Sequence, residues 1–368
     1  MRIFRVFIKI ILLVAFTLPL LPSTSHAATA AKRLFGAKAL PASLKPAAHG
    51  FYSKGCIAGA KAIPIDGPNW QVMRLSRNRR WGHPDLVKVI EDLSYKAKDD
   101  GWNGLLVGDM SQPRGGPMLT GHRSHQLGLD ADIWLRPMPD TRWTYKQRES
   151  ISAISVLKKK SIYVDKARWK RATTMLLYHA ASFPNVERIL VHPGIKKQLC
   201  DTVRGDRRWL NKIRPYWGHH YHFHLRIGCP PGSSGCRKQK STGSDLGCGK
   251  SLAWWFNVAL APKKKSKKKT SKKKKKKTKK RRQLVLKDLP QACTTVLKAN
   301  SVAKSNSEFR VRETAFAAVA FDMPKFTMAS AMRSQPIEKK GKNQDLQSEA
   351  ALELGVDTIP VPSQRPTR

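Results

Sequence analysis

The chain has 368 residues, with 70 Lys and Arg against 25 Asp and Glu, so its formal net charge is +45. Sixteen of the basic residues fall in Lys263–Arg282, which contains no acidic residue. A run of this kind cannot bury its charges, which excludes a packed element there and predicts a disordered, extended segment. Its charge also predicts contact with a polyanion.

The first 27 residues have the features of an export signal. Arg2, Arg5 and Lys9 precede the apolar run Ile10–Leu21, and the small residues of Ser25–Ala27 follow. The apolar run is shorter than the ~20 residues that a membrane-spanning helix needs, which favours a cleaved signal peptide over an uncleaved anchor. We therefore expect a soluble mature protein that acts outside the cytoplasm.

The cysteines all lie after this signal, which fits an oxidising compartment. An even number in an exported chain predicts three disulfides, although six cysteines allow 15 pairings. No two cysteines have CxxC spacing, which argues against a zinc ribbon or a thioredoxin-type site. The six residues are Cys56, Cys200, Cys229, Cys236, Cys248 and Cys293.

Composition divides the rest of the chain into segments. The tryptophans and histidines concentrate in one segment whose length fits a single domain. A short helix is predicted within the tail, near Glu349–Leu354. The predicted segments are a loose leader (28–49), a main domain (50–260), a lysine-rich loop (261–282), a return segment that carries Cys293 (283–298) and a mostly disordered tail (299–368).

Periodicity predicts an α+β fold. Apolar residues at helical spacing predict helices over Pro84–Asp99 and Trp169–Phe183. We expect a small antiparallel sheet that carries the functional site, flanked by helices and long loops and stapled by disulfides. The predicted strands are Leu105–Asp109, Leu129–Leu135, Glu187–His192 and Tyr221–Ile227.

Two of these strands alternate between apolar and ionisable residues. In Leu129–Leu135 the odd positions are apolar, so Asp130 and Asp132 share the opposite face. In His220–Ile227 the apolar residues likewise take one face, and three histidines and Arg226 take the other. Two strands that each present ionisable groups on one face are candidates for the floor of a metal site.

The residue types on this floor fit zinc. A catalytic zinc site usually has three protein ligands and a fourth position open to water. Asp132 and His224 could supply two ligands, and a turn through Gly128 could bring in His125. Ungrouped cysteines disfavour a purely structural zinc site. A histidine-rich metal-storage or sensing site remains an alternative at this point.

Several ordered motifs then resemble one family, the penicillin-insensitive murein endopeptidases, which are periplasmic zinc enzymes of the lysostaphin and D-Ala-D-Ala metallopeptidase group. The resemblance covers roughly Gly50 to Phe256, with weaker support as far as Cys293. The motifs are Gly108-Asp109, Gly115-Gly116-Pro117, Gly121–Ile133, Arg188–Pro193, Ile195–Cys200 and Arg214–Arg226.

The resemblance implies a role for each residue of the site. His125, Asp132 and His224 would be the zinc ligands. His222 would be the general base, and His219 would help to stabilise the tetrahedral oxyanion. The chemistry would be hydrolysis by metal-activated water, which needs no acylated serine and so would explain insensitivity to β-lactams.

The resemblance also places His122 at the edge of the site, as a candidate ligand of a second metal. The Asp-x-x-His that family members offer this metal is missing here, where the chain reads Lys158–Val164. One zinc ion is therefore expected, and a second is not. Asp130 is expected to orient a ligand from behind.

The family further implies the disulfides Cys56–Cys293, Cys200–Cys248 and Cys229–Cys236. Its substrate is the D-alanyl–diaminopimelate cross-link of peptidoglycan, and its compartment is the periplasm. The resemblance does not cover Lys263–Arg282, whose charge predicts contact with an anionic wall polymer, lipopolysaccharide or lipid, and no nucleic-acid partner is expected. The alternatives are a wall D,D-carboxypeptidase or L,D-peptidase on the same scaffold, and a polyanion-binding wall protein with a structural metal site.

Overall fold

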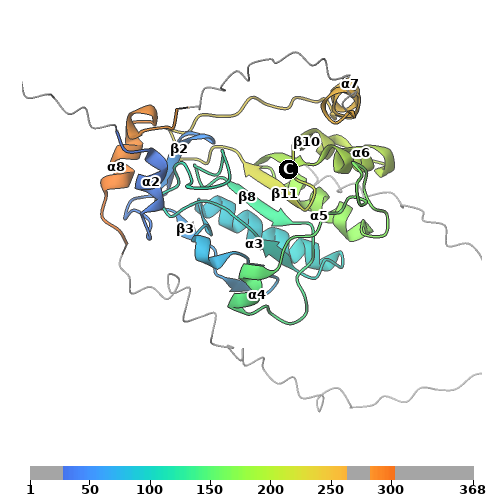
Figure 1. The fold of residues 1–368 in the computed structure, drawn as a ribbon, viewed down its shortest axis with the longest axis horizontal. Coiled ribbons are helices and arrows are strands. Elements are labelled where there is room, and N and C mark those ends of the chain that lie inside the picture. The colour runs from blue at the N-terminus through green and yellow to red at the C-terminus, as the bar shows by residue number, and fades with distance from the viewer. Residues whose placement is uncertain (1–27, 263–281, 303–368) are drawn as a thin grey trace, which may run out of the picture.

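The structure is a computed structural model that describes residues 28–262 and 282–302 (Figure 1). The predicted signal peptide, most of the lysine-rich run and nearly all of the tail, with its predicted helix near Glu349–Leu354, lie outside the described residues. The strands are β1 (Ala47–Phe51), β2 (Lys54–Ala58), β3 (Lys61–Ala62), β4 (Asp66–Gly67), β5 (Trp70–Val72), β6 (Trp81–Gly82), β7 (Leu105–Val107), β8 (Asp130–Trp134), β9 (Val186–Val191), β10 (Ile213–Pro215) and β11 (His222–Ile227).

Helices surround these strands, so the fold is mixed α+β as predicted. The α-helices are α2 (Ala31–Gly36), α3 (Pro84–Asp99), α4 (Tyr145–Ser150), α5 (Arg171–Ser182), α6 (Pro193–Thr202), α7 (Lys250–Trp254) and α8 (Ala292–Lys298). The shorter helical turns are η1 (Leu75–Arg77), η2 (Arg208–Lys212), η3 (Trp255–Ala259) and η4 (Leu286–Asp288). Among the described residues, none of the helices has the length and apolar character needed to cross a bilayer.

The main sheet differs from the predicted small antiparallel one. It has seven strands in the order β10-β9-β11-β8-β7-β5-β4, and it is mixed, because β10 with β9 and β5 with β7 are parallel pairs. The prediction missed short edge strands such as β4 and β10, whose two or three residues show no periodicity. The two central strands, β8 and β11, are antiparallel as expected.

Alternation fixes how β8 and β11 sit in the sheet. Ala131 and Ile133 of β8 and Phe223 and Leu225 of β11 are fully buried in the main hydrophobic core. A shift of one residue would turn these side chains to the other face, so their burial also fixes the direction of the polar residues between them. The polar side chains of both strands therefore gather on the face away from this core.

The helix α3 begins and ends where the sequence predicts. His83 caps its first turn, accepting a hydrogen bond from the Asp85 backbone N–H at 3.2 Å, and Pro84 occupies the position that needs no donor. Leu86, Ile90 and Leu93 lie on one face and are fully buried. This face packs into the core, and α3 also contacts α5, which covers β9.

A smaller cluster ties the two ends of the described chain together. In Figure 1, α2 and α8 lie side by side at one edge of the molecule, next to β2. The disulfide Cys56–Cys293 joins β2 to α8 within this cluster. Arg114, 1% exposed, donates hydrogen bonds to the carbonyl oxygens of Val296 and Leu297 at 2.7 and 2.9 Å. The return segment is thereby attached to the domain.

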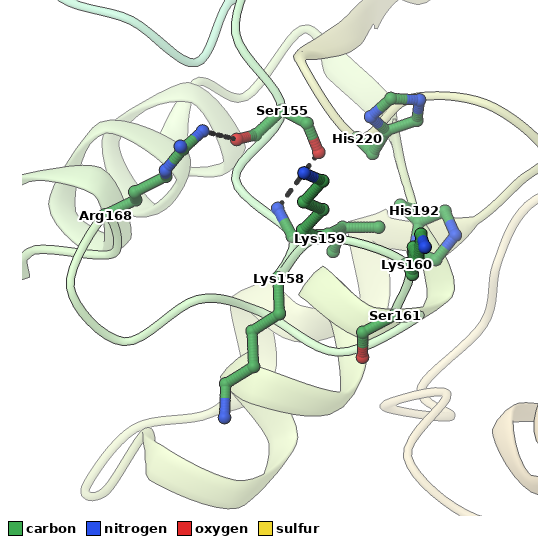
Figure 2. Close-up of a pocket in the computed structure, with 9 residues that line it drawn as sticks. Ser155, Lys158, Lys159, Lys160, Ser161, Arg168, His192 and His220 are labelled. Carbon is green, nitrogen blue, oxygen red and sulfur yellow. Dashed lines mark hydrogen bonds between the residues drawn. The ribbon is translucent and has the colours of Figure 1, made fainter.

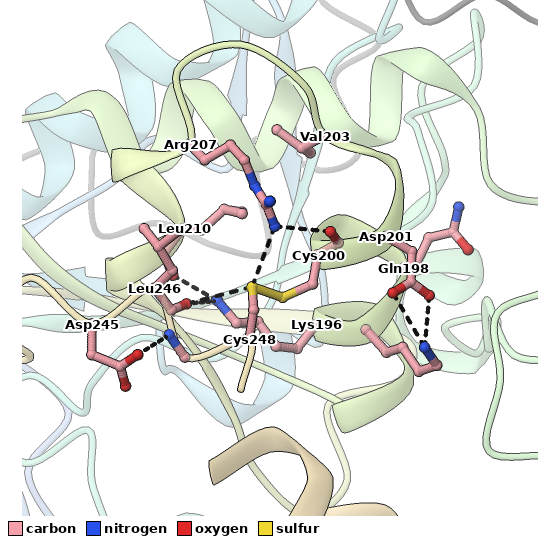
Figure 3. The surroundings of a disulfide bond; sticks show 12 residues. Lys196, Gln198, Cys200, Asp201, Val203, Arg207, Leu210, Asp245, Leu246 and Cys248 are labelled. Atoms are coloured by element: carbon pink, nitrogen blue, oxygen red, sulfur yellow. Dashed lines mark hydrogen bonds and ion pairs between the residues drawn. A yellow bond between two sulfur atoms is a disulfide. The ribbon is translucent and has the colours of Figure 1, made fainter. Parts of the chain in front are cut away.

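The other two disulfides, Cys200–Cys248 and Cys229–Cys236, are also the pairs that the family resemblance implies. Figure 3 shows the first of them, which fastens α6 to the loop before α7. Beside it the buried Lys196 donates to the carbonyl oxygens of Leu210 and Leu246, at 2.7 and 2.6 Å. The Lys196 side chain thus satisfies one backbone acceptor of η2 and one of this loop.

Candidate metal centre

The pairing of β8 with β11 brings the predicted ligands together. His224 lies opposite Asp132, and Arg226 lies opposite Asp130. Directly opposed residues in an antiparallel pair have neighbouring side chains. His224 uses this position to reach both carboxylates: its Nε2 is 3.0 Å from Asp130 Oδ1, and its Nδ1 is 3.2 Å from Asp132 Oδ1.

A loop positions His125 above the same strands. Its backbone is left-handed, with φ of 65°, and its backbone N–H donates to Asp130 Oδ2 at 2.9 Å. The side-chain Nδ1 donates to the Met110 carbonyl oxygen at 2.7 Å. This bond fixes the tautomer of the ring, so Nε2 carries a lone pair. That lone pair is directed toward Asp132 and His224.

Three donor atoms form a nearly equilateral triangle. His125 Nε2 is 3.1 Å from His224 Nδ1 and 3.4 Å from Asp132 Oδ1, and the third side, His224 Nδ1 to Asp132 Oδ1, is 3.2 Å. Zinc binds imidazole nitrogen and carboxylate oxygen at about 2.0–2.2 Å in tetrahedral geometry, which separates ligand atoms by about 3.3–3.5 Å. The triangle therefore fits one tetrahedral zinc ion.

The chemistry of these donor atoms also calls for a cation. In the neutral tautomers whose ring protons face Met110 and Asp130, the nitrogens of His125 and His224 that face each other both carry lone pairs. Asp132 Oδ1 is buried and accepts no hydrogen bond among the described residues. Buried acceptors without donors are costly, and a bound cation would satisfy all three at once.

His122 stands beside this triangle. Its Nδ1 is 3.5 Å from Asp132 Oδ2, and its Nε2 is 3.1 Å from Asp109 Oδ2. His122, His125 and Asp132 have ligand atoms within 4.8 Å of one another, so they form a second three-residue group that could hold a metal. The two groups share His125 and Asp132. His122 therefore lies beside the triangle, and its role as ligand of a second metal stays a prediction.

Asp130 supports the ligands without facing the open side of the cluster. It is fully buried, and besides His224 and the His125 backbone it accepts from Arg226 Nε at 2.6 Å. Burial opposes its ionisation, but the Arg226 charge and the hydrogen bond from His224 outweigh burial and hold the Asp130 pKa well below its usual range. Asp130 is therefore an anion that holds its two histidine neighbours in place.

The two remaining predicted residues, His222 and His219, lie next to the triangle. His222 Nε2 is 3.7 Å from Asp132 Oδ1, and His222 Nδ1 is buried without a hydrogen-bond partner among the described residues. Burial lowers the pKa of His222. The rings of His219 and His222 are 4.8 Å apart, and burial lowers the His219 pKa to about 4. Both rings can therefore be neutral at pH 7.

Asp109 belongs to the site, although the sequence did not single it out as a site residue. It pairs with Arg77 and Arg79 at 3.1 and 2.9 Å and holds the His122 ring. Burial disfavours its charge, yet the His122 hydrogen bond and both guanidinium groups prevail and lower its pKa to about 2. The Gly108-Asp109 motif at the end of β7 was the available signal.

The cluster lies at the floor of a cleft of about 350 Å³, which Asp109, His122, Asp132 and His222 help to line. Ser152 and Ala153 also line this cleft. His220 does not join this face as the strand alternation predicted, because β11 begins only at His222. His220 lines a separate hollow instead.

A buried group of histidines and aspartates at the floor of a cleft is a candidate metal centre. Comparison with known proteins gives the family. The model of the penicillin-insensitive murein endopeptidase family matches residues 48–298, more than half of the chain, and the chain belongs to this family.

Individual relatives agree. A penicillin-insensitive murein endopeptidase of Haemophilus influenzae is 45% identical over 207 residues, which are 56% of this chain and 72% of that protein. The protein of the same name from Klebsiella pneumoniae is 42% identical over 207 residues, 56% of this chain and 75% of its own. The protein of the same name from Pectobacterium atrosepticum is 41% identical over 216 residues, which are 59% of this chain and 76% of that protein.

Proposed function

We propose that this protein is a zinc-dependent murein endopeptidase that hydrolyses D-alanyl–diaminopimelate cross-links of peptidoglycan. Family membership supports the peptidase activity and the class of substrate. The observation that carries the zinc dependence is the triangle of His125 Nε2, His224 Nδ1 and Asp132 Oδ1, with sides of 3.1 to 3.4 Å. One zinc ion would be held by these three residues.

Zinc, when bound, supplies a Lewis acid that polarises the scissile carbonyl group and acidifies the attacking water. The chain's own contribution is to hold the ligands. Asp130 accepts hydrogen bonds from His224 Nε2–H and from the His125 backbone N–H, which fixes the direction of both rings. Arg226 balances the charge of Asp130. The polar groups are therefore arranged before substrate binds.

His222 is the proposed general base. A base must be neutral before it takes a proton, and burial lowers the His222 pKa in the direction that keeps the ring neutral. Its Nε2 lies near Asp132 Oδ1, beside the ligand triangle and on the cleft wall. His219 is the proposed oxyanion-stabilising residue. Its Nδ1 donates to the Trp217 carbonyl oxygen at 2.6 Å, so Nε2 can donate to an oxyanion only when the ring carries a second proton.

Two further proposals concern where the protein acts. The basic and apolar start of the chain supports export to the periplasm through a cleaved signal peptide. The 16 basic residues of Lys263–Arg282 support retention on an anionic wall polymer, lipopolysaccharide or lipid. Fractionation of cells that express the full chain, and of cells that express a chain without Lys263–Arg282, would test both.

Analysis of products tests the activity itself. Purified cross-linked muropeptide dimers are incubated with the protein, with and without a chelator, and the products are separated by chromatography. Conversion of dimers to monomers that stops with chelator is the expected result. Loss of a terminal D-Ala from monomers, with dimers intact, would instead identify a carboxypeptidase. Wall retention without any hydrolysis would favour a polyanion-binding protein.

A further inference from the structure

A second hollow, of about 540 Å³, lies outside the metal centre (Figure 2). Its walls carry four cationic side chains, those of Lys158, Lys159, Lys160 and Arg168, together with the rings of His192 and His220. None of the residues that line it is an aspartate or a glutamate. A hollow with walls of one sign of charge concentrates ions of the opposite sign.

The three lysines are available for a ligand. Among the described residues none of them forms an ion pair, and all three are exposed. Arg168 is partly engaged, because its Nε is 3.5 Å from Asp165 Oδ2 and its Nη1 donates to the Ser155 carbonyl oxygen. The uncompensated charge of this hollow therefore comes from the lysine turn.

That turn has a defined backbone. The Lys158 N–H donates to the Tyr163 carbonyl oxygen at 3.0 Å, and the Ser161 N–H donates to the Lys158 carbonyl oxygen at 3.1 Å. Lys160 takes the left-handed conformation that reverses the chain, with φ of 56°. A closed turn thus carries the three lysines, which lowers the entropic cost of holding their backbone beside one ligand. In Figure 2 the Lys159 side chain extends toward Ser155, whereas Lys158 points away from His192 and His220.

Two histidines complete the hollow. His192 Nδ1 accepts the Gly194 N–H at 3.0 Å, so the ring proton of neutral His192 is on Nε2, where it can be donated. Burial lowers the His192 pKa to about 4, which keeps this ring neutral at pH 7. His220 Nδ1 is buried and has no hydrogen-bond partner among the described residues. Each ring can therefore offer a donor to a ligand.

The hollow adjoins the catalytic cleft. Ser152 and Ala153 line the cleft, and Ser155, at most about 7 Å of chain further on, lines the hollow. On a second segment, His222 lines the cleft and His220, two residues earlier, lines the hollow. The two segments are joined by a hydrogen bond from the Val156 N–H to the His220 carbonyl oxygen at 2.9 Å. The cleft and the hollow are therefore bordered by the same two chain segments.

We propose that the lysine turn Lys158–Lys160, with His192 and His220, forms a substrate subsite that binds a free carboxylate of the peptidoglycan stem peptide. The inference rests on the proposed function, because it takes its ligand from that substrate. The hollow offers cations and neutral N–H donors, which are the partners that a carboxylate requires. It lies outside the ligand triangle, so it contributes to binding and not to the chemical step.

The experiment compares two substrates with the full-length wild type and three triple variants of it. The substrates are cross-linked muropeptide dimers with free stem-peptide carboxylates and the same dimers with these carboxylates amidated. For the wild type we expect amidation to raise KM about tenfold, since several exposed charge pairs are lost together. We expect kcat to stay within twofold, because binding is lost equally in the ground and transition states.

The triple variant K158Q/K159Q/K160Q should show the same rise in KM on the free substrate and almost no further rise on the amidated one. K158R/K159R/K160R, which keeps the charge, should resemble the wild type, as should the control K45Q/K61Q/K96Q on exposed lysines elsewhere. Equal KM values for both substrates with the wild type would overturn the subsite and leave the peptidase intact. Absence of hydrolysis by the wild type would instead overturn the proposed function.

Discussion

His224 lies directly opposite Asp132 on neighbouring antiparallel strands, with its Nδ1 atom 3.2 Å from Asp132 Oδ1. The same ring uses Nε2 to reach Asp130, two residues away on β8. The period of two along a strand is the reason that one histidine can contact both carboxylates. A donor set of this kind depends on strand register, which the buried apolar face fixes.

Asp130→Asn should weaken zinc binding while leaving the three ligands in place. The amide cannot accept from Arg226, His224 and the His125 N–H as the carboxylate does. Loss of such a support typically costs about 10- to 100-fold in metal affinity. Competition with a chromogenic zinc chelator measures the change, with the partly exposed Asp92→Asn as control. Unaltered affinity in Asp130→Asn would contradict the supporting role.

His222→Ala should give a folded, zinc-loaded and nearly inactive protein. A positioned general base contributes about 10²- to 10⁴-fold to rate, and the ring touches the ligand triangle only through the 3.7 Å approach to Asp132. The measurements are zinc content and kcat on muropeptide dimers. His49→Ala is the matched control for kcat, because that residue lies on β1, outside both the metal centre and the second hollow. Normal turnover by His222→Ala would remove its role as base.

Lys196 should make stability depend on pH. Burial lowers its pKa from 10.5 to about 7 in the folded state. Between about pH 7 and 10.5 the unfolded chain therefore binds more protons at this position, so the free energy of unfolding rises with pH over that window.

Lys196→Met removes the titrating group and both carbonyl contacts. We expect this variant to be less stable than the wild type at pH 9.5, and the difference to be smaller at pH 7. Urea unfolding at the two values measures it. A difference that does not change with pH would show that the lysine titrates normally.

The long disulfide should stabilise the protein more than the short one. Cys56 and Cys293 are 237 residues apart, whereas Cys229 and Cys236 are separated by 7. The loop-entropy model gives about 5 kcal/mol for the first and about 2.5 kcal/mol for the second. Urea unfolding of the variants C56A/C293A and C229A/C236A compares them. A larger loss in C229A/C236A would contradict the model.

The sequence predicted the parts of the fold that carry periodic patterns. The bounds of α3 and the alternation of β8 and β11 follow from apolar spacing, because burial requires that spacing. The parallel pairing of β5 with β7 could not be predicted, since strands of three residues show too little pattern. The separate position of His220 depends on where β11 begins, which local sequence does not decide.

The site was likewise predicted in part. Neighbouring motifs indicated His122, His125 and Asp132, and the structure brings these residues together. Asp109 and the Met110 carbonyl oxygen were missed as site groups, because their roles depend on long-range contacts that no spacing reveals. The roles of base and oxyanion donor remain predictions for His222 and His219.

The most direct test of the central claim measures bound zinc and hydrolysis together in the variants His125→Ala, Asp132→Ala and His224→Ala. Each variant removes one corner of the donor triangle. We predict that all three lose stoichiometric zinc and conversion of muropeptide dimers, whereas the control His49→Ala, a residue of β1 outside the triangle, keeps both. Full activity with no bound zinc in any of the three would contradict the account.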